Sequence, residues 1–368
     1  MACDLFKLAT PGVQHLHPYQ PGKPIEELER DYGIKNAIKL ASNENPLGPS
    51  PLVLEAIQKT LSDLARYPDG NGFTLKQALA KKHGVKIDTI TLGNGSNDTL
   101  EIIARTFVTP SDSVIFSEYA FAVYPIVTQA IGAQAIVTPA KDWGHDLTAM
   151  LAAIRENTRL IFIANPNNPT GTWVNQSSLR NFLEHIPEHI IVVIDEAYFE
   201  YACEHPDYPD SSQWLSTFPN LIVCRTFSKA YGLAGLRVGY TLSDSDIANL
   251  LNRVRQPFNV NSVALHAATV ALKDVDHLQK GLTLTRTGLQ QLVEAFGEMK
   301  LAFIPSIGNF VTVDVGRSGT EVYNKLLFEG IIVRPLEPYR MPHHLRITVG
   351  LDEENFLFIE ALRKVLEL

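Results

Sequence analysis

The segment CRTFSKAYGLAGLRVGY, residues 224–240, decides the fold, because it ends a strand-like apolar run and then supplies Lys229. Thr226 and Ser228 place hydroxyl groups beside this lysine, and Arg237 follows eight positions later. A lysine at a strand end can form an imine with an aldehyde, while neighbouring hydroxyls and a guanidinium bind a phosphate. A lone lysine is usually a solvated surface residue. This lysine has the neighbours that such chemistry needs, so we predict that Lys229 carries a cofactor.

The lysine segment resembles that of fold-type I pyridoxal-phosphate enzymes, and a second motif lies upstream. In IIVVIDEAYFEY, residues 190–201, Asp195 and Tyr198 follow a buried-looking strand. Open α/β sheets bind ligands at the carboxyl ends of such strands. A carboxylate at the pyridine nitrogen keeps the ring protonated, and a phenol at the ring oxygen tunes the cofactor. A strand end followed by a helix cap is an equally good interpretation of this motif alone.

A third motif, ANPNNPTG at residues 164–171, follows the strand-like LIFI. Its proline and glycine density requires a tight turn. In the family that this motif resembles, the asparagine before the second proline donates to the cofactor's ring oxygen. That residue is Asn168 here.

A fourth motif, TLGNGSNDTLEIIARTF at residues 91–107, runs from a strand into a helix. Backbone amides near Gly95, Ser96 and Asn97 would then face an anion at the helix N-terminus. The spacing differs from the dinucleotide pattern GxGxxG, because Asp98 stands where the third glycine belongs. In the resembling family this loop holds the cofactor phosphate.

An aromatic side chain is expected against the face of the pyridine ring. Tyr119, in SEYAFAVY, matches that position, although Phe121 or Tyr124 are alternatives and a core aromatic is nearly as probable.

Short apolar runs alternate with amphipathic stretches from about residue 39 to residue 250. This pattern predicts an α/β domain with a mostly parallel central sheet between helices. After residue 261 a long helical stretch, residues 263–299, precedes four more strand-like runs, which indicates a smaller α+β domain. We therefore expect an N-terminal arm with part of the small domain at 1–45, a large cofactor-binding domain at 46–260 and a small domain at 261–368.

The composition favours a small-molecule enzyme. The 368 residues are 45% hydrophobic, enough for two cores, and carry a formal net charge of -8 without a long basic run. This argues against nucleic acid or an anionic membrane as the partner. Asp4 and Lys7 interrupt any secretory signal, and no apolar run approaches the roughly 20 residues that span a bilayer. Three scattered cysteines indicate a reducing compartment, so we expect a cytoplasmic protein.

Further segments make the chain resemble the histidinol-phosphate aminotransferases over essentially its whole length. They are HPYQPGKPIEELER (17–30), LASNENPLGPSP (40–51), RYPDGNGFTLKQALAKKHGV (66–85) and LRITVGLDEEN (345–355). The resemblance implies pyridoxal phosphate as cofactor and transfer of an amino group between L-histidinol phosphate and 2-oxoglutarate, which gives imidazole acetol phosphate and glutamate. It also implies that Arg346 takes the substrate's α-carboxylate and Arg334 its phosphate or distal carboxylate. Guanidinium suits both oxyanions.

The same resemblance implies three further contacts. Tyr19 would lie near the substrate, and Asn309 would be a small-domain contact with substrate, although it is equally well a turn residue. Tyr67 would reach the cofactor phosphate of the neighbouring subunit. An active site then needs two chains, so we predict a homodimer.

Several alternatives share part of this pattern. An aromatic or acidic amino-acid aminotransferase has the same architecture, and a lyase similar to phosphothreonine decarboxylase also binds a phosphorylated substrate. A non-catalytic descendant would not need Lys229 with Asp195. A metal site is not expected, since HExxH and Cys/His spacings are absent and the adjacent His343 and His344 look like solvated loop residues.

Overall fold

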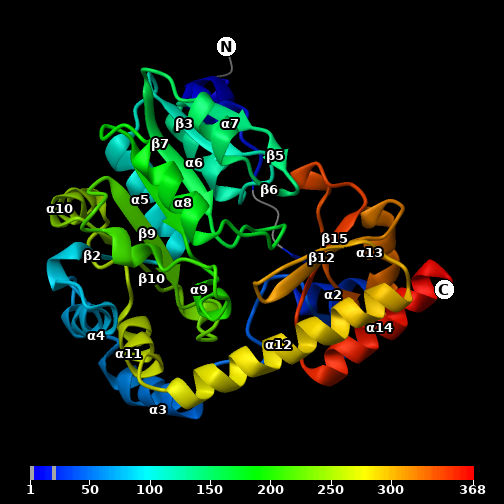
Figure 1. Cartoon of the computed structure of the whole chain (residues 1–368). Helices are drawn as coiled ribbons and strands as arrows, with labels where there is room; N and C mark the ends of the chain where they lie inside the picture. The colour runs from blue at the N-terminus through cyan, green and yellow to red at the C-terminus, as the bar shows by residue number, and fades with distance from the viewer. Residues whose placement is uncertain (1–3, 19–21) are drawn as a thin grey trace.

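The structure is a computed structural model that describes residues 4–18 and 22–368. Its fold is a large α/β part and a smaller part, connected along one side by the long helix α12 (Val275–Glu298), as Figure 1 shows. The predicted fold class is confirmed.

The large part is built on a seven-stranded sheet in the order β2-β10-β9-β8-β7-β3-β4. Only β10 runs antiparallel to its neighbours in this sheet, so the other strands end at one common edge. The strands are β2 (Ile90–Gly93), β3 (Ser113–Ser117), β4 (Gln134–Thr138), β7 (Thr158–Ala164), β8 (Ile191–Asp195), β9 (Leu221–Thr226) and β10 (Gly239–Ser243).

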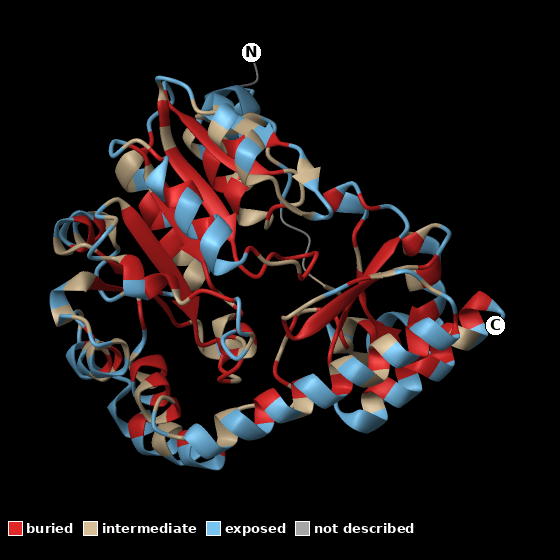
Figure 2. Ribbon diagram, viewed as in Figure 1, coloured by how far each residue is buried: buried red, intermediate tan, exposed pale blue. Residues whose placement is uncertain are grey.

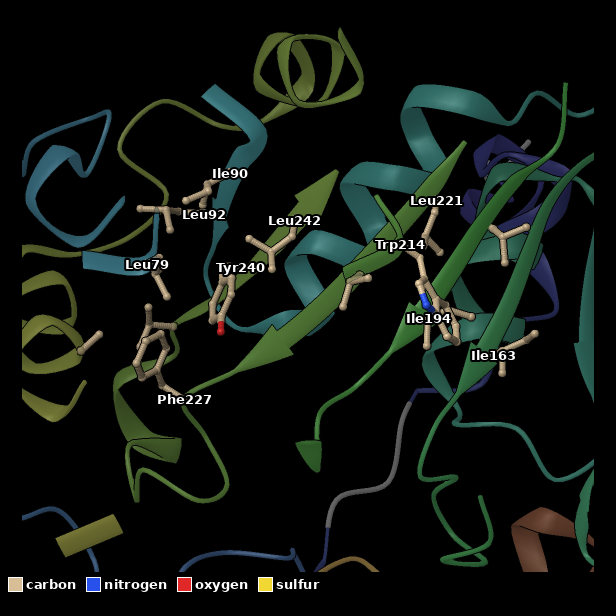
Figure 3. Packing of buried hydrophobic residues seen from close by; sticks show 14 of the residues in the cluster. Leu79, Ile90, Leu92, Ile163, Ile194, Trp214, Leu221, Phe227, Tyr240 and Leu242 are labelled. Atoms are coloured by element: carbon tan, nitrogen blue, oxygen red, sulfur yellow. The ribbon is translucent and has the colours of Figure 1, made fainter. Parts of the chain in front are cut away.

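Helices cover both faces of this sheet, which explains why its central strands are apolar at successive positions. Ile161 and Ile163 of β7 point into one core, and Leu160 and Phe162 into the other. Figure 2 shows the buried strands between helices whose outer faces are exposed, and Figure 3 shows one core, where Trp214 packs near the sheet. One face carries α5 (Ser96–Phe107), α6 (Val123–Ile131) and α10 (Ser245–Val254); the other carries α3 (Pro51–Thr60), α4 (Phe73–His83), α7 (Leu147–Ala152), α8 (Gln176–Glu184) and α11 (Ser262–Ala271).

The smaller part is an antiparallel sheet in the order β11-β12-β15-β14, packed against helices. A short parallel pair joins β1 to β13, so a segment near the N-terminus belongs to this part. The elements are β1 (Ile38–Lys39), β11 (Phe303–Ile304), β12 (Phe310–Asp314), β13 (Ile331–Ile332), β14 (Arg334–Pro335), β15 (His344–Thr348), α2 (Ile25–Tyr32), α13 (Gly319–Phe328) and α14 (Asp352–Leu366).

The helical stretch expected over residues 263–299 is two helices, α11 and α12. Asp274 caps α12 by accepting a hydrogen bond from the backbone N–H of His277. Ala264 and Ala268 of α11 pack in the core of the large part. We therefore propose a domain boundary within α12 rather than at residue 261.

The remaining elements are short. They are η1 (Leu5–Leu8), α1 (Pro11–Gln14), η2 (Leu61–Asp63), η3 (Ile87–Thr89), the hairpin of β5 (Ala140–Lys141) and β6 (Gly144–His145), α9 (Phe199–Ala202), η4 (Ser211–Trp214), η5 (Ala234–Leu236) and η6 (Glu337–Tyr339). No helix in the described part of the chain is both long and apolar enough to cross a membrane.

Candidate active site

A cavity lies between the two parts, at the carboxyl ends of β7, β8 and β9. Parallel strands bring the residues that follow them to one edge of the sheet. Most of the predicted site residues line this cavity: Ser96, Asn97, Asn168, Asp195, Tyr198, Thr226, Ser228, Lys229, Arg237, Arg334 and Arg346. Their individual roles remain predictions.

The loop after β7 is fixed by its own polar groups. The side chain of Asn165 donates to the carbonyl of Val174 at 3.1 Å and accepts from its N–H at 2.8 Å. The backbone N–H of Gly171 donates to the carbonyl of Asn167 at 2.8 Å. These bonds close the loop on itself and hold Asn168 at the wall of the cavity.

One end of the cavity is suited to an anion. The helix α5 begins at Ser96, and the first-turn amides of a helix have no acceptor within the helix. Arg237 Nη1 donates to Ser228 Oγ at 3.3 Å, so its guanidinium lies at the same end. Gly95 has a φ of 85°, which residues with a side chain rarely adopt, and a Cβ atom there would lie 2.3 Å from Arg237 Nη2, so this position favours glycine.

Lys229 is held with its amine in the cavity. Its Nζ donates to the carbonyl of Ser42 at 2.9 Å. Burial lowers the pKa of Lys229 to about 7. The positive charges of Arg346 and Arg237 also lower this pKa, whereas the carboxylates of Glu44 and Asp195 raise it. A lysine with this pKa is substantially neutral near pH 7, so it can act as a nucleophile or a base.

Asp195 ends β8 and has two differently placed oxygens. Its Oδ2 accepts a hydrogen bond from the Tyr124 hydroxyl at 2.8 Å. Its Oδ1 is buried and has no hydrogen-bond partner among residues 4–18 and 22–368. Burial raises the pKa of Asp195 to about 6, although hydrogen bonds from Tyr124 and from the Ala197 backbone oppose this rise. The carboxyl group therefore offers an acceptor to a donor in the cavity.

Asn43 is a cavity residue to which the sequence analysis gave no role. Its Nδ2 donates to the Tyr198 hydroxyl at 2.8 Å, and its backbone N–H donates to Thr348 Oγ1 at 2.9 Å. Burial raises the pKa of Tyr198 to about 12, although the charge of Arg346 and the hydrogen bond from Asn43 lower it. A signal was present in SNEN, since Asn43 has a φ of 55°, a conformation that asparagine tolerates better than most residues.

The two predicted arginines lie on adjacent strands of the small sheet. Arg334 of β14 and Arg346 of β15 are directly paired, so their side chains share one face, and both are buried. Arg346 donates to Asn168 Oδ1 and, at 2.7 Å, to the carbonyl of Ala41. The pair forms a positively charged wall opposite the ends of the large sheet.

The aromatic residues after β3 separate into three environments. Phe121 lines the cavity. The Tyr119 ring instead packs against Trp143, with centroids 5.3 Å apart, and Tyr124 is fully buried against Phe162. Of the three, only Phe121 lines the cavity, and the residue that lies against the pyridine ring stays a prediction.

Two other predicted residues, Asn309 and Tyr67, do not line the cavity. Asn309 is buried behind it and donates to the carbonyl of Asn43 at 3.0 Å. Tyr67 is 82% exposed, and its ring stacks on Phe258 at 4.7 Å. Tyr19 lies outside the described residues.

The histidine pair also differs from expectation. His344 belongs to β15 and is buried, with its ring 4.9 Å from that of Trp143, so the prediction of a solvated loop residue is wrong for it. Within the described residues, no group of His, Cys, Asp and Glu side chains could hold a metal ion.

Comparison with known proteins identifies the family to which this chain belongs. The model of the class I and II aminotransferases matches residues 35–362. The chain therefore belongs to the class I and II aminotransferases, enzymes that depend on pyridoxal phosphate.

Within that family, the chain is similar to histidinol-phosphate aminotransferases. It is 60% identical to histidinol-phosphate aminotransferase 2 of Pseudomonas fluorescens, over 100% of this chain and 99% of that protein. It is 57% identical to histidinol-phosphate aminotransferase 1 of Nitrosococcus oceani, with the same coverage. The crystal structure of the Sinorhizobium meliloti enzyme in complex with pyridoxal-5'-phosphate superposes with a TM-score of 0.88 at 34% identity, over 97% of each chain.

Proposed function

We propose that this chain transfers the amino group of L-histidinol phosphate to 2-oxoglutarate, giving imidazole acetol phosphate and L-glutamate in histidine biosynthesis. The observation that carries the proposal is the pair of buried arginines, Arg334 and Arg346, in the same cavity as Lys229. The similarity to histidinol-phosphate aminotransferases over the whole chain supports the same substrates.

The cavity fits pyridoxal phosphate. The buried Asp195 Oδ1 is suited to accept from a protonated pyridine nitrogen. The first turn of α5, Ser228 and Arg237 form a cradle for a phosphate, which a side chain on Gly95 would fill. We propose that Asn168, Tyr198 and Thr226 complete the cofactor site. When bound, the cofactor withdraws electrons from the amine-bearing carbon of the substrate.

Lys229 is the group that moves the proton. With a pKa of about 7 its amine is poised to accept a proton from the amine-bearing carbon of the substrate. The carbonyl of Ser42 orients Nζ in the cavity. In the half-reaction with the second substrate the transfer would run in the opposite sense, and Lys229 would give a proton to the amine-bearing carbon of the new amino acid.

The arginine pair explains how one site can accept two different substrates. L-Histidinol phosphate carries a phosphate ester near its amine-bearing carbon, whereas glutamate carries one carboxylate there and a second at its far end. Guanidinium groups bind phosphate and carboxylate through paired hydrogen bonds. We propose that Arg346, held beside Asn168 and Ala41, binds the α-carboxylate of glutamate. Arg334 binds the distal carboxylate of glutamate, and the two guanidinium groups share the phosphate of histidinol phosphate.

A spectroscopic titration tests the substrate pair. Addition of L-histidinol phosphate to the holoenzyme without an oxo acid should convert the cofactor's absorbance to that of its amine form, and 2-oxoglutarate should reverse the change. An equal response to aromatic donors at equal concentration would favour the aromatic aminotransferase instead. Release of carbon dioxide without dependence on 2-oxoglutarate would identify a lyase.

We also propose a homodimer with shared active sites. Tyr67 and Phe258 form an exposed aromatic pair outside the cavity, which supports a contact with another chain. Exposed leucines accompany this pair on α3 and the segment after it: Leu52, Leu54, Leu61 and Leu64.

Subunit complementation tests this arrangement. Mixed dimers of Lys229→Ala and Tyr67→Ala chains should regain one intact site if Tyr67 serves the neighbouring subunit, and none if it serves its own. Sedimentation of the wild-type protein as a monomer at assay concentration would contradict the dimer. The exposed free thiol of Cys203 is consistent with a reducing compartment, and we propose the cytoplasm.

A further inference from the structure

Tyr124 of α6 contacts the carboxylate of Asp195 from beneath the cavity. Its hydroxyl donates to Asp195 Oδ2 at 2.8 Å, and its side chain is completely buried. The ring stacks on Phe162 of β7, with centroids 4.6 Å apart and planes 5° from parallel. Packing thus fixes the ring, and the ring fixes the hydroxyl.

The hydrogen bond decides which carboxylate oxygen faces the cavity. Asp195 lines the cavity, whereas Tyr124 does not. Since Oδ2 is engaged by Tyr124 below, Oδ1 is the oxygen left for a group in the cavity. Without that donor, the carboxylate of Asp195 would keep only the hydrogen bond from the Ala197 backbone, so rotation about its last side-chain bond, whose torsion is broad, would be less restricted.

The same bond favours the ionised form of Asp195. Burial raises the pKa of this carboxyl group, and the Tyr124 hydroxyl opposes the rise because it donates to the charged form. The other ionisable groups that face this pair are Cys224 of β9, Tyr198 and Lys229. Lys229 is the cation among them, and its pKa is itself lowered. Together with the Ala197 backbone, Tyr124 is therefore a neutral donor that helps to keep the carboxylate charged.

We propose that Tyr124 is a positioning residue that acts through Asp195, holding its carboxylate ionised and oriented with Oδ1 toward the pyridine nitrogen of the cofactor. This inference rests on the proposed role of Asp195. It assigns to Tyr124 a function different from stacking on the cofactor, and it requires no contact between Tyr124 and substrate.

The test measures cofactor binding by the apoenzyme as a function of pH. Tyr124→Phe keeps the stacked ring and removes only the donor. The bond is already present without cofactor, so its loss acts on affinity only through the ionisation and orientation of Asp195, and affinity at neutral pH should fall roughly two- to tenfold. Below the pKa of Asp195, about 6, affinity should fall in the wild type because the carboxylate becomes neutral. In Tyr124→Phe this fall should begin about one pH unit higher.

A matched control is Tyr240→Phe. The Tyr240 hydroxyl is also buried, and it forms a hydrogen bond with His83 Nε2 at 2.9 Å, in the other core of the large part. Its loss should lower the thermal midpoint of the apoenzyme to a similar extent but leave the pH profile of cofactor binding unchanged. Equal pH profiles for Tyr124→Phe and wild type would overturn the proposal.

A double-variant cycle separates this inference from the function of the site. If Tyr124 acts through Asp195, then adding Tyr124→Phe to Asp195→Asn should cause no further loss of cofactor affinity, and additive losses would contradict the inference. If Asp195→Asn alone binds cofactor normally, the proposed role of Asp195 fails instead. Replacement of Tyr124 by 3-fluorotyrosine, which keeps the shape and is a stronger donor, should move the pH profile downward; an upward or absent shift would overturn the proposal even if Tyr124→Phe folds poorly.

Discussion

The two walls of the cavity are built in different ways. On the wall of the large part, Asn168 and Lys229 follow parallel strands and Asp195 ends one, each within a short local motif. On the opposite wall, Arg334 and Arg346 come from the small sheet and meet a segment around Asn43 that is about 300 residues away in sequence. We propose that the first wall offers the groups for the chemistry and that the second offers the charges that bind the substrates. Substitutions on the two walls should therefore have different signatures.

The largest effect is expected on the first wall. Lys229→Ala removes the proposed base, so turnover should fall roughly 10⁴-fold. The cofactor should still bind without a covalent link, because Ser228 and Arg237 are unchanged. Single-turnover kinetics and cofactor content after gel filtration check both statements. Lys325→Ala, at an exposed lysine of α13, is the control, and full activity of Lys229→Ala would exclude its assignment.

A smaller and more selective loss is expected on the second wall. Arg346→Gln removes a buried guanidinium that we propose binds both substrates, so kcat/KM should fall roughly 10²- to 10³-fold for histidinol phosphate and for glutamate. Arg334→Gln should affect phosphate and dicarboxylate substrates more than aromatic donors. Steady-state kinetics with the three substrate classes measure the difference, with the exposed Arg317→Gln as control. Equal losses for every donor in Arg334→Gln would remove its selective role.

The charge of Arg346 on the second wall lowers the pKa of Lys229 on the first wall. Because its pKa is lowered to about 7, the neutral amine dominates above that pH and the ammonium below it. The rate at which the apoenzyme condenses with the cofactor should therefore fall about tenfold for each pH unit below this value. Arg346→Gln should move the midpoint to higher pH, because the Arg346 charge lowers the pKa. Stopped-flow absorbance measures this rate, and a midpoint near the ordinary lysine pKa would contradict the burial argument.

Asn43 offers a test at the junction of the walls. Asn43→Ala removes the donor to the Tyr198 hydroxyl and an acceptor for Thr348, so kcat/KM should fall roughly five- to thirtyfold. Asn36→Ala is a matched control, since Asn36 is exposed and has a φ of 61°, similar to the 55° of Asn43. The same loss in both variants would trace the effect to backbone strain rather than to the hydrogen bonds.

The sequence predicted the first wall more completely than the second. Strand ends and turns are local features, so motifs around Asp195 and Lys229 identify residues that the sheet then brings together. Asn43 was missed because its role depends on Tyr198 and Thr348, which lie far along the chain. The break between α11 and α12 was missed because the junction contains neither glycine nor proline, and Asp274, which caps α12, is a weak local signal.

The smallest effect concerns the orientation of aromatic rings, which sequence position does not determine. Phe121→Ala should weaken cofactor binding about two- to tenfold, because Phe121 lines the cavity. Tyr119→Ala should instead lower the thermal midpoint with little change in cofactor affinity, since its ring packs on Trp143. Fluorescence titration of the two apoenzymes with cofactor, alongside thermal unfolding, separates the outcomes. A larger loss of affinity in Tyr119→Ala would show that Tyr119 is the stacking residue after all, and that ring orientation changes when the cofactor binds.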